Sequence, residues 1–451
     1  MREGLQHAIR GHVFTRGQPG FAQAAHVFNP RFDDVLPDAV ARPVNATDVR
    51  DAIRFCTEHG DQVRARSGGH SYAGYSTASR GVVLDLRRLD RITVDQGSGT
   101  ATVEAGAQLI DVYDALAARG LTVPGGSCPS VGIAGVTLGG GFGLAARHFG
   151  LTIDSLVAVE IVTADGQLRS VDAASDPDLL WAIKGGGGGN FGVVTAFTFA
   201  LHPMPSSSTY FEVTWPWPAA SEAIDAWQTW APRATDAVTS ILHIESSGPR
   251  IFATGQYIGQ SGQVAAVVKP LLDATGASLA INTELPYLET QLLLAGCEGR
   301  TVAACHTVGA ARGGVMPRET FNAKSDYVAQ PLPAAGRAAM IAAAEQPGGD
   351  LLCDAYGGAI ARVGPAATAF VHRDALFCIQ YYGAGAGTEW IEQAWRRLRP
   401  FVSGMAYQNY IDPALNGWQQ AYYGKNLARL EATRERVDPH HFFNFPQAIG
   451  R

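Results

Sequence analysis

The chain has 451 residues, of which 46% are hydrophobic and 17% charged, and its formal net charge is −6. This length predicts two closely packed domains rather than one core, and the composition excludes a disordered or fibrous protein. The negative charge and the singly scattered arginines give no electrostatic reason to expect nucleic-acid binding. Because no apolar run is long enough to span a membrane and MREGLQHAIRGHVF lacks a signal-peptide pattern, we expect a cytoplasmic protein without a membrane partner.

The N-terminal part alternates predicted strands and helices that are punctuated by glycine. Apolar residues at helical spacing predict a helix over 108–118, and Gly120 provides its stop. The Asp165-Gly166 turn between two apolar runs predicts a β-hairpin. Strands are expected at 82–86, 92–94, 101–105, 156–163, 168–171 and 191–199.

A Pro/Ser-rich stretch at 202–208 marks a predicted domain boundary. Paired strands and covering helices follow it, which is typical of an α+β domain with an antiparallel sheet. The predicted strands are 210–215, 240–244, 250–257 and 278–283, and the predicted helices are 219–230, 264–275 and 427–436. We therefore expect an α+β protein with a first domain at 1–205, a second at 206–415, and a segment at 416–451 that returns to the first.

Two glycine-rich segments carry the residues best suited to cofactor chemistry. In RSGGHSY (66–72), Gly68 and Gly69 allow backbone amides to approach a bound anion closely. In GGSCPSVGIAGVTLGGGFG (125–143), a run of N–H groups can face a pyrophosphate. Neither segment is a Rossmann fingerprint or a Walker motif, and each alone is also compatible with tight turns.

His70 directly follows Gly68 and Gly69, and Cys128 follows Gly125-Gly126-Ser127, so both side chains can approach a bound ring without steric cost. A neutral imidazole and a thiolate are the two common nucleophiles that add to an electron-poor aromatic ring. Taken singly, a hydrogen-bonded loop histidine and a buried thiol are the more ordinary interpretations of the two residues.

The spacing of the cysteines does not indicate a metal site, because the sequence contains no CxxC motif and no cluster of His and Cys. Cys56, Cys353 and Cys378 lie in apolar stretches and are expected in the core. Cys297 and Cys305 are able to pair across a loop, but two buried thiols are expected in a reducing compartment.

The pattern around His70 and Cys128 extends through further motifs, namely LLWAIKGGGGGNFGVVTAFTF, CDAYGGAI, AYQNYIDPAL and WQQAYYGKNLARLEATRERVDPHHFFNFPQAI. Together these motifs resemble the berberine bridge enzyme-like FAD-linked oxidases of the vanillyl-alcohol oxidase superfamily. The site pattern is most similar to the bicovalent oligosaccharide and aclacinomycin-type oxidases. The resemblance implies a two-domain fold with a PCMH-type FAD-binding domain and an antiparallel-sheet substrate domain covered by helices.

The resemblance also implies covalent FAD, bonded at its 8α-methyl group by His70 and at C6 by Cys128. Family oxidases tend to carry valine where Val131 stands, three residues after the cysteine, which implies O2 as electron acceptor and hydrogen peroxide as product. The remaining cofactor-binding residues implied by the motifs are Arg66, Ser67, Gly68, Gly69, Ser71, Gly132, Gly135, Gly140, Phe142, Gly192, Val193, Val194 and Asn444.

Tyr410 and Asp354 align with a catalytic tyrosine and its aspartate partner in the sugar-oxidising members. A free phenol titrates near about 10, so it is a poor base at neutral pH unless a partner takes its proton. Outside the motifs, a strand aromatic and a turn residue would be the ordinary interpretations of the two positions.

Tyr72, Phe142 and Gln380 resemble residues that contact the substrate. Phe142 departs from the pattern, since many relatives have tyrosine there, and the change removes one possible activator of the base. Leu352 replaces a polar residue of some oligosaccharide oxidases, which makes the pocket less suited to long glucans. Four other aromatics are expected either to stack against a substrate or, more ordinarily, to pack in a core, namely Trp215, Trp217, Tyr257 and Tyr287.

The leading hypothesis is an FAD-dependent oxidase that acts on a sugar hemiacetal or on a hydroxyl of a glycosylated metabolite. A tailoring enzyme that oxidises or cyclises a secondary metabolite is the first alternative. A catalytically silent flavin-binding protein is an alternative of another class, and a nicotinamide-dependent dehydrogenase is disfavoured by the missing fingerprint. The expected partners are a small-molecule substrate and O2.

Overall fold

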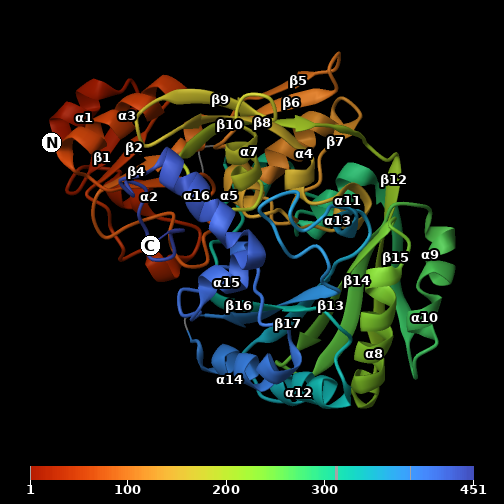
Figure 1. The fold of residues 1–451 in the computed structure, drawn as a ribbon. Helices are drawn as coiled ribbons and strands as arrows, with labels where there is room; N and C mark the ends of the chain where they lie inside the picture. Colours follow the sequence, from red (N-terminus) through yellow and green to blue (C-terminus); the bar gives the residue numbers. More distant parts are fainter. Residues whose placement is uncertain (1, 310–312, 386, 451) are drawn as a thin grey trace.

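The computed structural model describes residues 2–309, 313–385 and 387–450. Within these residues, strands from the N-terminal part form two sheets and one short pair (Figure 1). The first sheet has the order β1-β2-β4-β3 and the second the order β5-β6-β10-β8-β9. Their strands are β1 (His12–Thr15), β2 (Ala39–Arg42), β3 (Val63–Arg66), β4 (Val82–Asp85), β5 (Ile92–Asp95), β6 (Thr100–Glu104), β8 (Leu156–Val162), β9 (Leu168–Asp172) and β10 (Val193–Ala200), and the short pair is β7 (Leu121–Thr122) with β11 (His202–Pro203).

A third sheet, called here the large sheet, follows with the strand order β15-β12-β14-β13-β17-β18-β16. All neighbouring strands whose register is resolved in it run antiparallel. Its strands are β12 (Ser207–Trp215), β13 (Val238–Glu245), β14 (Arg250–Tyr257), β15 (Ser278–Pro286), β16 (Phe321–Val328), β17 (Asp350–Ala355) and β18 (Phe377–Ala384).

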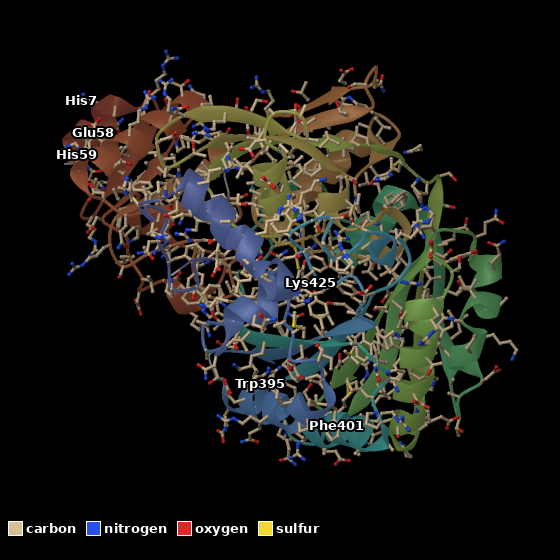
Figure 2. All side chains as sticks on the ribbon, in the orientation of Figure 1. His7, Glu58, His59, Trp395, Phe401 and Lys425 are labelled. Carbon is tan, nitrogen blue, oxygen red and sulfur yellow. A yellow bond between two sulfur atoms is a disulfide. The ribbon has the colours of Figure 1, made fainter. Side chains whose placement is uncertain are left out.

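The two faces of the large sheet have different environments, because alternate side chains of a strand point to opposite faces. On β13, Leu242 and Ile244 belong to a buried core with helices α8, α12 and α14. Ile241 and His243 on the same strand instead line a cavity. Figure 1 shows these helices together on one side of the sheet, and Figure 2 places Trp395 and Phe401 in that helical layer.

The helices complete an α+β fold with two principal hydrophobic cores, one in the N-terminal part and one under the large sheet. The predicted helix at 108–118 and the predicted hairpin at 156–171 are confirmed. The helices are α1 (Arg2–Ala8), α2 (Phe21–Ala25), α3 (Ala46–His59), α4 (Leu109–Ala117), α5 (Ile133–Leu138), α6 (Ala146–Phe149), α7 (Pro177–Ile183), α8 (Ala220–Trp230), α9 (Ser261–Val267), α10 (Lys269–Leu272), α11 (Tyr287–Leu294), α12 (Ala334–Ala344), α13 (Ala359–Arg362), α14 (Glu389–Leu398), α15 (Trp418–Tyr423) and α16 (Leu427–Val437).

One predicted helix is wrong as a single element. The segment 264–275 falls on α9 and α10, which are separated at Val268. Pro270 has no backbone N–H and its ring clashes with the carbonyl four residues earlier, so a continuous helix is disfavoured there. The boundary stretch at 202–208 is also more ordered than expected, since β11 pairs with β7 and β12 begins at Ser207. The domain limits at 205 and 415 stay a prediction.

The C-terminal segment lies beside the N-terminal part (Figure 1). Arg429 and Arg436 on α16 form ion pairs with Asp178 and Asp176 at the start of α7. The backbone N–H of Ile449 donates to Asn190 Oδ1 at 3.0 Å. The chain therefore leaves the N-terminal part, builds the large sheet and comes back.

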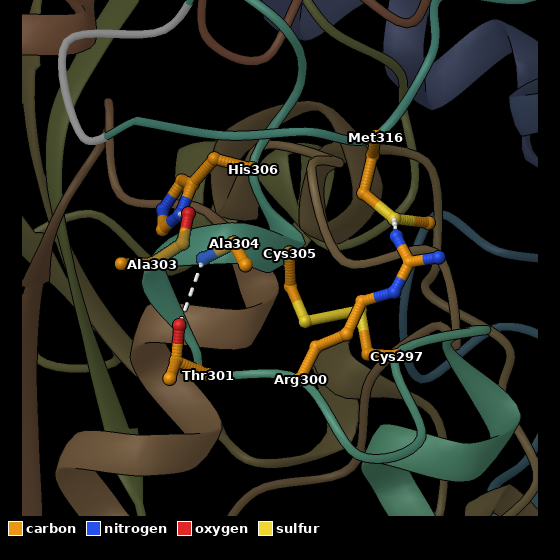
Figure 3. Close-up of a disulfide and its surroundings, with 8 residues drawn as sticks. All are labelled: Cys297, Arg300, Thr301, Ala303, Ala304, Cys305, His306 and Met316. Atoms are coloured by element: carbon orange, nitrogen blue, oxygen red, sulfur yellow. Dashed lines mark hydrogen bonds between the residues drawn. A yellow bond between two sulfur atoms is a disulfide. The ribbon is translucent and has the colours of Figure 1, made fainter.

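The structure joins Cys297 and Cys305 in a disulfide, so the expectation of two separate thiols is wrong (Figure 3). Their Cα atoms are 5.8 Å apart because the chain turns back between α11 and a short 3-10 helix, η6 (Ala303–Cys305). Cys56, Cys353 and Cys378 are free and buried, as predicted. No helix in the described part of the chain is long and apolar enough to cross a membrane.

Candidate active site

A cavity of about 800 Å³ lies between the N-terminal part and the large sheet. Its N-terminal wall consists of the loop 67–72, the segment 126–132, helix α5 and the segment 192–194. Its opposite wall is the face of the large sheet that carries Ile241 and His243, called here the open face, together with residues 407–411. Residues far apart in the sequence therefore meet in one cavity.

The His70 loop and the Cys128 loop touch through their backbones. A Cβ atom on Gly68 would lie 2.3 Å from the backbone nitrogen of Gly132 and 2.7 Å from the carbonyl oxygen of Ser130. Only glycine allows this approach. His70 Nε2 shares a hydrogen bond with Ser130 Oγ at 2.9 Å, which ties the two loops a second time. The glycine predicted to approach an anion thus holds the two candidate anchors in one cavity.

The environment of His70 makes it a neutral imidazole. Burial lowers its pKa to about 3, and its ring stacks on Phe28 with centroids 3.8 Å apart. Nε2 is engaged with Ser130 Oγ, which holds the ring in one orientation at the cavity wall. A neutral imidazole held in one orientation is the form that acts as a nucleophile.

Cys128 is exposed, although the next two residues, Pro129 and Ser130, are buried. Its thiol opens onto the cavity, and the surrounding protein raises its pKa, with a smaller contribution from the charge of Glu319. The thiol is therefore reachable by a bound ring but is not ionised on its own.

The cavity wall fits a large planar cofactor. Gly135 on α5 and Gly188 are exposed inside the cavity, and a Cβ atom on Gly135 would meet nothing within 4 Å. That open space over a glycine-lined wall is where a ring system can lie, with one nucleophile in reach at His70 and one at Cys128. The predicted cofactor residues that line the cavity are Ser67, Gly68, Gly69, His70, Ser71, Cys128, Val131, Gly132, Gly135, Phe142, Gly192, Val193 and Val194.

Three predicted cofactor residues do not line the cavity. Arg66 is buried against Asp85 at 3.1 Å and donates to the carbonyl oxygens of Ala24 and Ala25, so it fixes α2 to the first sheet. A Cβ atom on Gly140 would face Phe370 instead of the cavity. Asn444 lies between two phenylalanines that do line it.

Tyr410 and Asp354 are brought together across the cavity from separate elements. Asp354 lies near the end of β17, and Tyr410 in a 3-10 turn, η8 (Gln408–Tyr410). The Tyr410 hydroxyl donates to Asp354 Oδ2 at 2.9 Å. Burial raises the pKa of Asp354 to about 7, partly offset by this hydrogen bond, and burial also raises the pKa of Tyr410. The pair forms an acid–base unit that titrates near neutrality through the carboxyl group.

The predicted substrate residues surround this pair. Tyr72 stacks on Tyr410 with centroids 5.5 Å apart, and Gln380 Nε2 donates to the Tyr72 hydroxyl at 2.9 Å. Phe142 stacks on Tyr356 at 5.3 Å, at the edge of a buried aromatic cluster that also contains Tyr407. All three predicted substrate residues line the cavity.

Sequence reasoning missed Tyr407. Its phenol oxygen accepts hydrogen bonds from the backbone N–H groups of Gly141 and Phe142, at 3.0 and 3.2 Å, and from Asn409 Nδ2 at 3.0 Å. These donors fill the acceptor capacity of the oxygen and connect the glycine-rich segment to the turn that holds Tyr410. The one signal in the sequence was its place three residues before Tyr410 in AYQNY.

The sequence analysis also did not predict that the open face of the large sheet lines the cavity. The signal for it was the alternation of side chains between the two faces along each predicted strand. The aromatics singled out for stacking do not line the cavity. Trp215 and Tyr287 are buried, and Trp217 and Tyr257 pack against the core under the large sheet, so core packing is the correct interpretation.

The similarity to known proteins extends over nearly the whole chain. A family model for an FAD binding domain matches residues 37–172, and a model described as "Berberine and berberine like" matches residues 406–450. The chain is 33% identical to the FAD-linked oxidoreductase YgaK of Bacillus subtilis over 98% of this chain and 97% of that protein. It is 29% identical to the xylooligosaccharide oxidase of Thermothelomyces thermophilus, over 97% and 92% of the two chains.

Two solved structures are closely similar. Physcomitrella patens BBE-like 1 superimposes with a TM-score of 0.93 at 30% identity, covering 100% of this chain and 99% of that one. A chitooligosaccharide oxidase superimposes with a TM-score of 0.90 at 26% identity, covering 99% and 98%. The two-domain α+β arrangement is therefore shared along the whole length of these chains.

Proposed function

Because this chain belongs to the berberine bridge enzyme-like FAD-linked oxidoreductases, we propose that it is an oxidase that converts an alcohol to a carbonyl compound. The alcohol is a sugar hemiacetal or a hydroxyl of a glycosylated metabolite. The observation that carries the proposal is the hydrogen bond from Tyr410 to Asp354 in the same cavity as His70 and Cys128. Relatives named as xylooligosaccharide and chitooligosaccharide oxidases support the carbohydrate side of the proposal.

His70 and Cys128 would hold FAD by two covalent bonds. The neutral imidazole of His70 and the thiol of Cys128, which opens to the cavity, are the two nucleophiles that such a double attachment needs. Two tethers would fix the ring in one orientation relative to Tyr410, which favours reaction through preorganisation.

When held by His70 and Cys128, FAD would supply the two-electron acceptor for the alcohol, and O2 with two protons from the reaction would then be reduced to hydrogen peroxide. The chain's own residues manage the proton. As the hydride departs, the substrate hydroxyl releases its proton to the Tyr410 oxygen, and Tyr410 passes its own proton to Asp354 Oδ2. The raised pKa of Asp354 makes its carboxylate a better acceptor than an ordinary aspartate.

A peroxide assay over a panel of sugars and aromatic alcohols tests the activity on the purified protein. Release of peroxide with at least one alcohol is expected, and its loss in Tyr410→Phe assigns the base. If no alcohol reduces the bound flavin and Tyr410→Phe changes nothing, the protein is a silent flavin-binding protein and the proposal is wrong.

Acid denaturation tests the attachment. The yellow cofactor should stay with the denatured chain, and each single variant, His70→Ala or Cys128→Ala, should lose one tether while keeping the other. Release of free FAD from the denatured wild type would disprove covalent attachment.

A further inference from the structure

The segment that carries Tyr410 runs along the outer edge of the large sheet. β16 is the last strand of that sheet, and it pairs with β18 on its inner side. On its outer side, the backbone N–H of Tyr327 donates to the carbonyl oxygen of Met405 at 2.8 Å, and the N–H of Ser403 donates to the Tyr327 carbonyl oxygen at 2.9 Å. The edge strand therefore sets the course of the chain as it approaches Tyr410.

Two adjacent residues of β16 hold this segment on either side of Tyr410. The backbone N–H of Tyr407 donates to Ser325 Oγ at 2.9 Å. Lys324 Nζ donates to Asp412 Oδ2 at 2.5 Å. Because alternate side chains of a strand point to opposite faces, the two contacts reach the segment from opposite faces of the sheet. Tyr410 thus lies between two anchors on one strand.

Lys324 is buried together with its partners. Only 5% of the residue is exposed, and its ammonium group also lies 3.0 Å from Glu392 Oε1 on α14. The ammonium lies 5.0 Å from the centre of the Trp395 ring on the same helix. A charge buried this deeply costs free energy unless it is paired, so the ammonium group holds both carboxylates in place.

The backbone contacts of Asp412 lead away from the large sheet. Its N–H donates to the hydroxyl of Tyr422 at 2.9 Å, and its carbonyl oxygen accepts from Gln447 Nε2 at 2.7 Å. Both partners belong to the C-terminal segment that returns to the N-terminal part (Figure 1). Asp354 instead lies on β17 of the large sheet. The bond from Lys324 therefore links Asp412 to the sheet that carries Asp354.

The ion pair lies behind the tyrosines of the active site. A second cavity, of about 150 Å³, is lined by Tyr72 together with Lys324, Glu392 and Asp412. Tyr72 also lines the active-site cavity, where it stacks on Tyr410. Within the described part of the chain, neither Lys324 nor Asp412 lines the active-site cavity. An effect of this pair on the reaction must therefore act through the position of other side chains and not through contact with the substrate.

From these contacts we infer that Lys324 is a positioning residue, whose ion pair with Asp412 keeps the Tyr410 hydroxyl at Asp354. This inference rests on the proposed function and adds a residue to its proton transfer. The hydrogen bond from Tyr410 to Asp354 joins a turn to a strand, so its length depends on how firmly the turn is fixed to the sheet. Loss of the ion pair leaves one side of the turn without its anchor on the sheet, which slows proton transfer.

Removal of one carboxylate at a time tests the inference, because Lys324 keeps one partner in each variant. Asp412→Ala should lower the limiting rate of flavin reduction by about tenfold and change the dissociation constant of the substrate by about twofold or less. The matched control is Glu392→Ala, which removes the partner on α14 and should keep both values within about twofold of wild type. Equal limiting rates in Asp412→Ala and Glu392→Ala would overturn the inference.

A double-mutant cycle shows whether Lys324 acts through Tyr410. Lys324→Met should lower the rate of reduction by about tenfold in the wild-type background, but by about twofold or less in Tyr410→Phe, where the positioned hydroxyl is already absent. Lys324→Arg keeps the charge and should recover most of the rate. An equal loss from Lys324→Met in both backgrounds contradicts the inference. If Lys324→Met does not fold, the same cycle is made with Asp412→Ala.

Hydrogen exchange of the flavin-loaded protein, measured by mass spectrometry, separates this inference from the proposed function. Amides of the segment 405–412 should exchange about tenfold faster in Asp412→Ala than in Glu392→Ala or wild type, because the segment has lost an anchor. If exchange rises in this way but no alcohol reduces the flavin of the wild type, the proposed function fails and the positioning of the turn by Lys324 stands. If alcohols are oxidised but exchange in Asp412→Ala equals that of the wild type, the inference alone is wrong.

Discussion

Single residues decide the pH dependence of the reaction. Asp354 must be ionised to accept the proton from Tyr410, and its pKa is raised to about 7. The rate of flavin reduction is therefore expected to rise with pH through about 7, since the protonated carboxyl below that pH cannot act as acceptor. Asp354→Asn should remove this rise, and Tyr410→Phe should lower the rate by about 10² to 10⁴.

The matched control for this prediction is Asp350→Asn, the same substitution on the same strand. Asp350 does not line the cavity and accepts a hydrogen bond from the backbone of Ser246. The Asp350→Asn variant should keep the wild-type pH profile of the rate of flavin reduction, measured by stopped flow. A profile that loses its rise in Asp350→Asn, or keeps it in Asp354→Asn, would assign the titration to another group.

Val131 is the residue at which the choice of electron acceptor can be tested. It is half-buried, lines the cavity and follows Cys128 by three positions. An added methylene in Val131→Leu should narrow the access of O2 and slow reoxidation severalfold, while reduction by substrate stays unchanged. Val136→Leu, the same change on α5 elsewhere in the wall, serves as control. Equal reoxidation rates in wild type and Val131→Leu would show that Val131 does not control the reaction with O2.

At the scale of elements, Tyr407 links the turn η8 to the glycine-rich segment. Removal of its hydroxyl in Tyr407→Phe leaves the N–H groups of Gly141 and Phe142 buried without their acceptor, so Tyr410 should lose its fixed position. We expect the rate of reduction to fall by about tenfold while the midpoint of the pH profile, which belongs to Asp354, stays near 7. A shifted midpoint would make Tyr407 part of the titrating unit.

The disulfide between Cys297 and Cys305 fixes the segment that follows α11, whose last residues line the cavity. His306 beside it pairs with Asp111 on α4 at 3.0 Å. Because the bond closes a short loop, the double variant Cys297→Ser, Cys305→Ser should lower the free energy of unfolding by about 2.5 kcal/mol, measured in urea without reductant.

Reduced wild type should show the same loss, and Cys56→Ser, at a free buried thiol, tests for effects of cysteine removal in general. The prediction also bears on the proposed cytoplasmic location, because stable disulfides are rare in reducing compartments. If thiol titration of protein taken directly from cells finds both cysteines reduced, the bond is not part of the native protein there.

Some elements of the structure can be predicted from the sequence and others cannot. The hairpin at 156–171 and the helix at 108–118 follow from local patterns, and the two-domain α+β fold is confirmed. The hydrogen bond to the Tyr407 oxygen joins positions 141 and 407, and the cavity-lining face of the large sheet depends on the pairing of β14, β13, β17 and β18. Such long-range pairings leave no local periodicity, whereas the break at Pro270 was readable from the sequence and was overlooked.

At the scale of the whole molecule, the cavity exists only while the two parts of the chain stay together. Buried Arg147, on α6 before the large sheet begins, reaches into the second part. Its guanidinium donates to the carbonyl oxygens of Tyr356, Val238 and Ala234 at 2.9, 2.7 and 2.8 Å, and to two further carbonyls in the segment 232–235. This one side chain therefore fixes the start of β13 and the end of β17 against the N-terminal part.

Arg147→Met keeps the volume of the side chain but leaves these carbonyl oxygens without donors. We expect the free energy of unfolding to fall by about 3 kcal/mol, since each buried unpaired acceptor carries a desolvation cost. Arg147→Lys should recover part of the loss through one or two of the bonds. Arg233→Met, at an exposed arginine of the same region with a single bond to the Thr229 carbonyl, should change stability by about 0.5 kcal/mol or less. If Arg147→Met and Arg233→Met lose equal stability in urea unfolding, the two parts are held together by their apolar contacts instead.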